Sequence, residues 1–171
     1  AFDEFYQISK EMGAQFKFAY VVQADDPSDY VGAFFDANLD ERIDMIWLSI
    51  LSIPKSFESL TMTTDITTNR VVCMELLQEA LDQEWIKSKP CHMLGLWESL
   101  IDLVEGRKYP WIYSNDSSSA FQTGKHLKTY EHLKVPGGKV HEKVVFEQTE
   151  LTPEQRSMII KNVAAIKEIV Q

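Results

Sequence analysis

Cysteine is scarce in this sequence, and long hydrophobic runs are missing from it. The chain of 171 residues contains two cysteines, Cys73 and Cys91, which is too few for the disulfide framework of a small secreted scaffold. We therefore expect two buried or reduced thiols in an intracellular protein, either cytoplasmic or nuclear. No apolar stretch approaches the roughly 20 residues that cross a bilayer, so we expect no membrane-spanning segment.

Basic residues are fewer than acidic ones, 17 against 26. The formal net charge is -9 at pH 7, which repels the phosphate backbone whose neutralisation by Lys and Arg supplies most non-specific affinity for nucleic acids. Binding to nucleic acids is therefore disfavoured. Lysines gather between residues 125 and 143, and this stretch is the candidate for a local basic face.

The motifs of several enzyme classes are absent. The sequence has no Gly-rich loop followed by Lys-Ser or Lys-Thr and no Gly-x-Ser-x-Gly elbow, so nucleotide hydrolysis and the commonest serine hydrolases lack support. Cys91 and His92 are adjacent in an expected helix, where neighbouring side chains do not face each other. The histidines between residues 126 and 141 match no metal-ligand spacing. We therefore expect no catalytic residues, no bound metal and no cofactor.

What is present is the composition of a folded domain. Hydrophobic residues make up 44% of the chain and charged residues 25%, values typical of globular proteins. Residues 1–171 have the length of one ordinary domain, and we expect a single globular unit. Because the sequence begins with Ala1 and not with an initiator Met, we also expect either a processed chain or a piece excised from a larger protein.

Hydrophobic spacing predicts the elements of this domain. Alternation predicts strands over residues 15–23, 109–114 and 140–147, with 126–134 as either a hairpin partner or a short helix. The sequence therefore predicts an α+β fold, with four to five helices packed on a small, mostly antiparallel sheet. The expected helices lie at residues 2–12, within 30–53, at 68–85, at 91–104 and after a capping box that begins at Thr152.

Residues 36–47 resemble the start of a calcium-binding EF-hand loop. The family's pattern needs Gly at its sixth position and a bidentate Glu at its twelfth, but these positions hold Glu41 and Trp47. We therefore favour a helix junction with solvated acids over a calcium site. The ligands that the resemblance would imply are Asp36, Asn38, Asp40 and Asp44.

The order of elements after Leu94 resembles the nuclease domain of an influenza-type polymerase acidic subunit, over about the last 80 residues. This order is a helix, an extended segment at Tyr109, a His/Lys-rich segment, a strand and a C-terminal helix. The nuclease family needs strand-borne acids and a Lys around a divalent metal, but no Pro-Asp step or Glu-x-Lys lies on a predicted strand. The resemblance therefore implies a catalytically degenerate nuclease-like domain of a segmented negative-strand RNA virus polymerase subunit.

The aromatic residues near position 110 are the preferred binding surface. They lie in an extended segment beside the polar loop 115–119, and aromatic side chains concentrate binding energy at interfaces. We expect a non-enzymatic protein-interaction or regulatory domain, belonging to a larger intracellular or viral protein, that binds a protein partner through residues 109–143. An ordinary edge strand is the alternative for the aromatic residues. The expected partner-binding residues are Tyr109, Trp111, Tyr113, His126, Tyr130 and His132.

Overall fold

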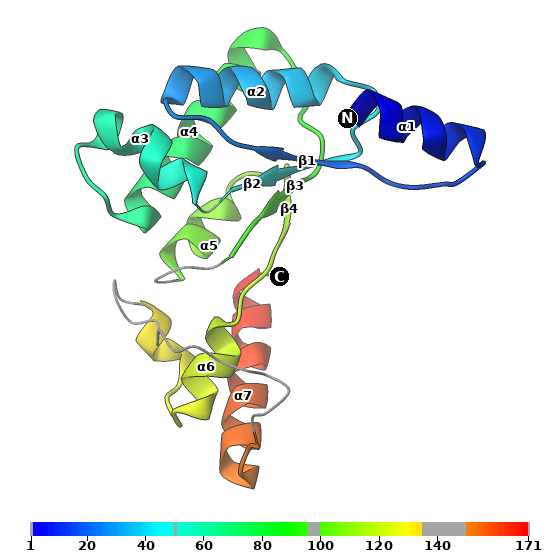
Figure 1. Cartoon of the computed structure of the whole chain (residues 1–171). Helices are drawn as coiled ribbons and strands as arrows, with labels where there is room; N and C mark the ends of the chain where they lie inside the picture. The colour runs from blue at the N-terminus through cyan, green and yellow to red at the C-terminus, as the bar shows by residue number, and fades with distance from the viewer. Residues whose placement is uncertain (1, 50, 96–99, 135–149, 171) are drawn as a thin grey trace.

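The fold was obtained as a computed structural model of the whole chain (Figure 1). It describes residues 2–49, 51–95, 100–134 and 150–170. Within these ranges, seven α-helices, one 3-10 helix and four strands follow one another along the chain. None of the described helices is both long and apolar enough to cross a lipid bilayer.

Four parallel strands form one sheet, and they lie in the sheet in the same order as in the sequence. The strands are β1 (Ala19–Val22), β2 (Met45–Leu48), β3 (Cys91–Met93) and β4 (Ile112–Asn115). Helix α2 (Pro27–Leu39) joins β1 to β2, α3 (Ser52–Thr61) and α4 (Ile66–Glu84) join β2 to β3, and α5 (Ile101–Gly106) joins β3 to β4. Strands and helices therefore alternate as in an α/β fold.

The predicted α+β fold with a mostly antiparallel sheet is wrong. The helix predicted through Ile53 is interrupted by β2, and the helix predicted over 91–104 begins instead with β3. Both segments contain short apolar runs, which fit a buried parallel strand as well as one side of a helix. Two additional strands between helices convert the arrangement into parallel crossovers.

Other sequence predictions have mixed outcomes. Strand β1 is the second half of the predicted strand 15–23, and β4 overlaps the predicted strand 109–114. The 126–134 segment contains a 3-10 helix, η1 (Tyr130–Lys134), so its helical alternative is confirmed. The predicted strand 140–147 lies outside the described residues. The N-terminal helix is confirmed as α1 (Phe2–Glu11) and the C-terminal helix as α7 (Pro153–Val170).

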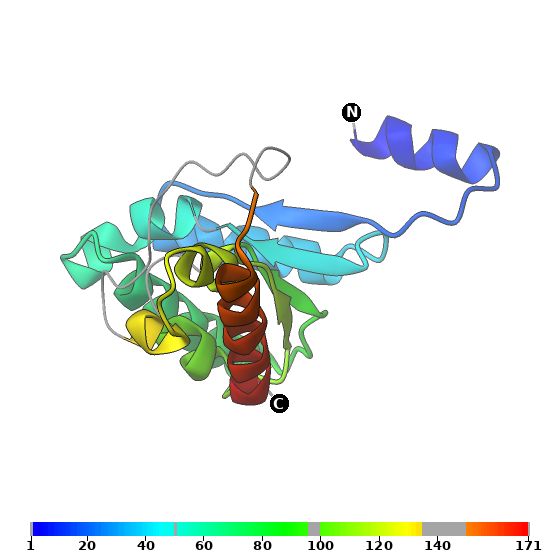
Figure 2. The same ribbon diagram turned by 90° about the horizontal axis from the view of Figure 1, so that it is seen from below.

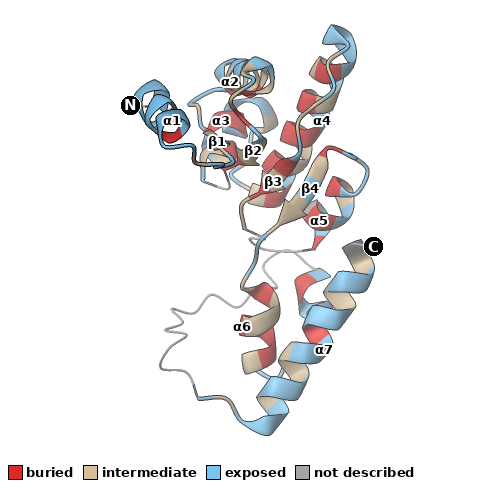
Figure 3. Ribbon diagram, turned by 90° about the vertical axis from the view of Figure 1, so that its right-hand side faces the viewer, coloured by how far each residue is buried: buried red, intermediate tan, exposed pale blue. Residues whose placement is uncertain are grey.

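One face of the sheet is closed by helices. Alternate strand residues on this face are buried and pack against aromatic and aliphatic side chains of α2, α3 and α4. Figures 1 and 3 show these helices on one side of the sheet. The strand residues of the helix-covered face are Val22, Ile46, Leu48, Cys91 and Met93, none more than 5% exposed.

The C-terminal helices form a second packed group beside α5. Helix α6 (Ser119–Lys125) lies along α7, as Figures 1 and 2 show, and α7 also contacts α5 and η1. A Cβ atom at Gly124 would lie 2.6 Å from Cγ1 of Ile159, so glycine permits this close approach. The predicted capping box is confirmed, because Thr152 and Gln155 exchange backbone-to-side-chain hydrogen bonds.

Helix α1 stands apart from the other elements in Figure 2. Arg42, which precedes β2, connects it to the body: its guanidinium forms an ion pair with Asp3 and lies 4.8 Å from the centroid of the Phe2 ring. The side-chain hydrogen bond from Arg42 also lowers the pKa of Asp40 to about 2. A local network of charges and rings therefore holds α1 at this end of the sheet.

Candidate functional site

The face of the sheet that points away from α2, α3 and α4 carries one continuous row of side chains. Val21 pairs with Trp47, Trp47 with His92, and His92 with Ser114, one residue from each strand. Each of these residues is neither fully buried nor fully exposed. We call the side of the sheet that carries this row the open face.

His92 is the centre of a hydrogen-bonded group at the end of this row. Its Nδ1 lies 2.8 Å from Oγ of Ser114, and its Nε2 lies 3.1 Å from Oδ1 of Asp116. An ionised carboxylate can only accept, so Nε2 must carry a proton and donate it to Asp116. In the neutral imidazole Nδ1 then accepts, and the Ser114 hydroxyl donates to it.

The segment after β3 supplies a second donor to Asp116. Gly95 has a positive φ of 70°, a conformation that favours glycine, and its backbone N–H donates to Oδ1 of Asp116 at 2.9 Å. The buried guanidinium of Arg70, on α4, donates to the carbonyl oxygens of Gly95 and Leu94 at 2.5 and 3.1 Å. The Gly95 amide is thereby fixed relative to the sheet.

These contacts set the ionisation of Asp116. Desolvation is the largest single influence and raises its pKa, but the hydrogen bonds from the Gly95 amide and from His92 together outweigh it, and the pKa is lowered. Asp116 is therefore ionised at neutral pH. Its side chain is 63% exposed, whereas that of His92 is 17% exposed.

A Ser–His–Asp group with these contacts has the parts of a hydrolase triad. The exposure of its aspartate and serine is the reverse of that in a triad. In a triad the aspartate is buried and orients the histidine, while the serine meets the substrate. Here Asp116 is the most exposed of the three, and Ser114 lies within the sheet row. The arrangement can therefore present a fixed carboxylate to solvent better than it can present a nucleophilic hydroxyl.

Trp47 lies beside His92 on the open face. The two ring centroids are 5.5 Å apart, with an angle of 49° between the ring planes. The indole nitrogen Nε1 of Trp47 is buried and has no hydrogen-bond partner in the described part of the chain. An unpaired buried N–H costs roughly 1–3 kcal/mol.

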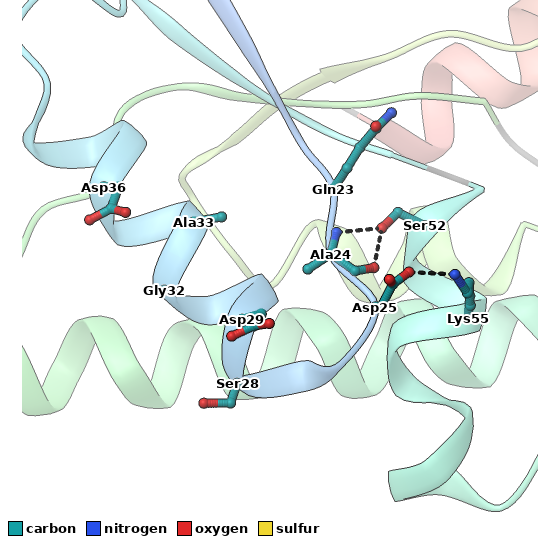
Figure 4. A pocket seen from close by; sticks show the side chains of 10 residues that line it. All are labelled: Gln23, Ala24, Asp25, Ser28, Asp29, Gly32, Ala33, Asp36, Ser52 and Lys55. Atoms are coloured by element: carbon teal, nitrogen blue, oxygen red, sulfur yellow. Dashed lines mark hydrogen bonds and ion pairs between the residues drawn. The ribbon is translucent and has the colours of Figure 1, made fainter.

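A broad acidic hollow of about 900 Å³ lies where β1 leads into α2. Figure 4 shows Asp29 and Asp36 along α2 on one side of it, and Lys55 of α3 opposite, in an ion pair with Asp25. Ser52, which also lines the hollow, exchanges two hydrogen bonds with the backbone of Ala24, both 3.0 Å long. The hollow lies at the same carboxyl edge of the sheet as Asp116.

Of the three expected binding residues between 109 and 113, two lie in or against the core. Trp111 is 8% exposed, and its Nε1 donates to Oε1 of Gln78 at 2.8 Å. Tyr109 is partly buried, and its ring centroid lies 5.6 Å from that of Trp111. Tyr113 is 75% exposed. Trp111 and Tyr113 also line a hollow of about 470 Å³ together with Ile86.

The other three expected binding residues belong to the C-terminal helical group. His126 and His132 are exposed, at the end of α6 and in η1 respectively. Tyr130 packs against the apolar cluster that contains Leu133, and its backbone N–H donates to Oδ1 of Asn162 at 2.8 Å. The six expected residues thus lie in two groups, one at β4 and one around η1.

Three of the four EF-hand-like residues are engaged in local structure. Asn38 donates from Nδ2 to the carbonyl of Phe34, and its Oδ1 accepts from the backbone N–H of Lys89. Asp40 binds Arg42, and Asp44 accepts from the backbone N–H of Phe18. Among the described residues, no three His, Cys, Asp or Glu side chains gather within reach of one metal ion.

The two cysteines are free and buried, as the sequence predicts. Cys91 and His92 point to opposite faces of β3 because successive strand residues alternate. Burial raises the pKa of Cys91 to about 12, so this thiol is not a nucleophile at neutral pH.

Sequence reasoning missed the group at His92, Ser114 and Asp116. The spacing of Ser114 and Asp116 places both on one face of an extended segment, which is a usable signal. The position of His92 beside them depends on β3 being the neighbour of β4, which the sequence did not indicate.

Comparisons with known proteins identify no relative. No family model, no curated protein and no solved structure matches this chain.

Proposed function

We propose that this chain is a protein-interaction domain that associates through the open face of its sheet. The observation that carries the proposal is the topology: four parallel strands in sequential order, with their connecting helices on one face. The open face is left with a row of half-buried side chains, including an indole N–H that lacks an acceptor.

This topology is that of half of an eight-stranded β/α barrel. In such barrels each strand is followed by a helix, the helices form the outer ring, and the inward side chains fill the interior. The four strands and helices α2 to α5 supply half of this arrangement. Within the described residues, β1 and β4 each pair on one side only, and an unpaired strand edge is a template for another strand.

The occupant that fits both edges is a second copy of this chain. A twofold axis parallel to the strands places β1 of one copy beside β4 of the other, and the same pairing recurs on the opposite side. Both new pairs are parallel, and the total of eight strands closes a barrel whose interior side chains can fill it. Trp47, which is partly exposed in one copy, then lies inside the barrel, where the second copy covers it.

The proposed binding surface, the open face and edges of the sheet, differs from the surface that the sequence favoured. The expected surface covered residues 109–143, and its member Tyr113 lies on β4, next to the edge that the second copy would pair with. The nuclease-like alternative stays a prediction, because part of the element order that motivates it lies outside the described residues.

Sedimentation equilibrium tests the proposal. We expect the unmodified chain to have twice the mass of one chain at micromolar concentration. Trp47→Glu, which places a charge on the open face, should give a single-chain mass. The matched control is Trp85→Glu, because Trp85 is 94% exposed at the end of α4, and this variant should remain dimeric.

Two checks keep the test decisive. Circular dichroism must show that each variant is folded, and Val21→Lys, at the other end of the same row, replaces Trp47→Glu if that variant unfolds. A single-chain mass for the unmodified protein at about 100 μM would contradict the proposal. A folded open-face variant that remains dimeric would contradict it as well.

A further inference from the structure

We propose that helix α1 of one copy of the chain docks in the hollow of about 470 Å³ beside β4 of the second copy. This docking presupposes the association of two copies proposed above and adds a second contact to it. The hollow is lined by the end of α4 and by residues that precede β3 and β4. It lies at the edge of the sheet where the strands begin, and we call it the amino-edge hollow.

Helix α1 has one side packed on its own chain and another side exposed. Phe2 and Tyr6 lie against Phe18, with ring centroids 5.6 and 5.5 Å from that of Phe18. Four other apolar side chains, from α1 and the segment after it, are between 46% and 75% exposed. We call them the α1 stripe: Phe5, Ile8, Met12 and Phe16. The first three are three or four residues apart and share one side of the helix, and exposed apolar side chains that gather in this way mark an interaction surface.

The position of α1 brings this stripe to the proposed partner. In Figures 2 and 3, α1 lies on the side of β1 that points away from the other strands. In the proposed pairing, β4 of the second copy occupies this side. Because the pairing is parallel, the amino ends of the two strands are then neighbours, about 4.8 Å apart. The segment between α1 and β1 therefore leads past the residues that precede β4 of the second copy.

The amino-edge hollow is a preformed apolar receptor for the stripe. Ile86 lines it from the turn after α4, and Trp111 lines it from the residue before β4. The Trp111 ring is held in place, because its Nε1 donates to Oε1 of Gln78 at 2.8 Å. Tyr113, which also lines the hollow, lies on the strand edge that β1 of the other copy would pair with. Side chains of the stripe that enter this hollow remove apolar surface of both copies from water.

Charge complementarity also favours α1 as the occupant. Glu4 and Glu11 are exposed on α1 and seven residues apart, so they lie along one line beside the stripe. Lys87, which is exposed, lines the hollow and can face these carboxylates. Asp82 lines the hollow as well, and its Oδ1 accepts from Nε2 of Gln78 at 2.9 Å. The acidic residue of the hollow thus already has a partner on its own helix.

The size of the strand edges gives a further reason for a second contact. Strands β1 and β4 have four residues each, whereas a stable interface buries about 800 Å² on each partner. Docking of α1 extends the contact along the amino edge of the sheet. The twofold axis repeats this contact on the opposite side of the dimer, so each substitution in the stripe acts twice.

Mixed samples of the full chain test the docking by NMR. One chain carries a spin label at Gln7→Cys, an exposed position of α1 outside the stripe, and the other is enriched in ¹⁵N. We expect the label to broaden the ¹H–¹⁵N signals of the Ile86 amide and the Trp111 indole in the other chain. Leu60→Cys is the control label, because Leu60 is 52% exposed near the start of α4, whereas Ile86 follows its end. It should leave both signals sharp.

Two charge substitutions test the stripe by sedimentation equilibrium. Ile8→Glu should raise the dissociation constant of the dimer about tenfold or more, because it buries an unpaired charge in each of two contacts. Gln7→Glu adds the same charge on the same helix outside the stripe and should stay within about threefold. Met12→Glu replaces Ile8→Glu if circular dichroism shows that the latter loses helix.

The outcomes distinguish this docking from the association itself. A dimer in which the Ile86 and Trp111 signals stay sharp would overturn the docking and leave the strand pairing in place. Equal dissociation constants for Ile8→Glu and Gln7→Glu would do the same. A single-chain mass for the unmodified protein at about 100 μM would overturn both proposals.

Discussion

The two faces of the sheet are made from alternate residues of the same four strands, but their surroundings differ. On the helix-covered face, Ile46 and Leu48 are at most 1% exposed and pack against α2, α3 and α4. On the open face, Trp47 and His92 are half-buried, and polar groups form part of the row. One face is therefore completed by the helices of the chain itself, and we propose that a second copy completes the other.

This contrast teaches that strand alternation can place a stabilising apolar face and a face with polar groups on one sheet. The apolar face contributes folding free energy through burial. The open face carries His92 and leads to Asp116, whose exposure would be a disadvantage in a core. Substitutions on the two faces should therefore have different consequences, and the following experiments measure that difference.

The largest effect is expected on the helix-covered face. Leu48→Ala should lower the free energy of unfolding by about 2–5 kcal/mol, because it removes buried contacts and leaves a cavity. Val21→Ala, on the open face, should cost about 1 kcal/mol or less, since its side chain is only partly buried. Urea denaturation at low protein concentration, where association adds least, provides the comparison. Equal losses for the two variants would show that the faces do not differ in this way.

Substitution of the buried Arg70 should give the next largest loss in the free energy of unfolding. Arg70→Met removes the hydrogen bonds to the carbonyls of Leu94 and Gly95, and leaving buried acceptors unpaired should cost about 2 kcal/mol. Lys55→Met is the control, because its ion pair lies at the surface, with the lysine side chain 69% exposed, and should contribute less than about 1 kcal/mol. The midpoint of urea unfolding measures both, and an Arg70→Met midpoint equal to that of the control would contradict this role.

A smaller effect is expected from the charge of Asp116, and it depends on pH. The pKa of Asp116 in the folded chain is lowered, below the ordinary value of about 3.9. Its stabilising contribution is therefore fully present above the ordinary pKa and is lost as the pH falls through the folded value. Because the side chain is 63% exposed, solvent screening should keep this contribution below about 1 kcal/mol.

Asp116→Asn tests this dependence. The difference in stability between the unmodified chain and the variant should be constant from about pH 7 to pH 5 and should shrink as the pH falls below about 4. Thermal unfolding across this range provides the measurement. A difference that does not change with pH would show that the carboxylate charge is not involved.

The smallest expected effect is on the pKa of Asp40, a residue that lies on neither face of the sheet. Arg42 lowers the pKa of Asp40 to about 2 through a side-chain hydrogen bond. In Arg42→Ala this pKa should return toward the ordinary value of about 3.9, while the pKa of Asp116 should not move. Titration of the carboxyl ¹³C resonances by NMR checks both, and an unchanged Asp40 would mean that another group holds it ionised.

The sequence predicts the helices better than the strands, for physical reasons. Helix α7 has a complete capping box at Thr152, and α1 has an amphipathic pattern, so local signals agree with the fold. Strand β2 has only four residues, and its apolar run continues a helical spacing that begins at Ile43. A pattern of this length fits either structure, and tertiary pairing decides between them.

The candidate site is harder still to predict. His92, Ser114 and Asp116 meet because β3 pairs with β4 in parallel and the register shifts between Cys91 and His92. Neither the pairing nor the shift leaves a local signal in the sequence. Trp111 shows the opposite problem, because an aromatic beside a polar loop suggests a binding surface, but its burial against Phe34 makes it part of the core.

The pairing of β1 with β4 of a second copy can be measured directly by the distance between spin labels. Tyr20→Cys and Tyr113→Cys, both at exposed strand positions, would be labelled separately and mixed, while the buried Cys73 and Cys91 remain unlabelled. Because neighbouring strands lie about 4.8 Å apart, we expect the label at position 20 of one chain to lie less than roughly 20 Å from the label at position 113 of the other. An absence of dipolar coupling between the two labelled chains would contradict it.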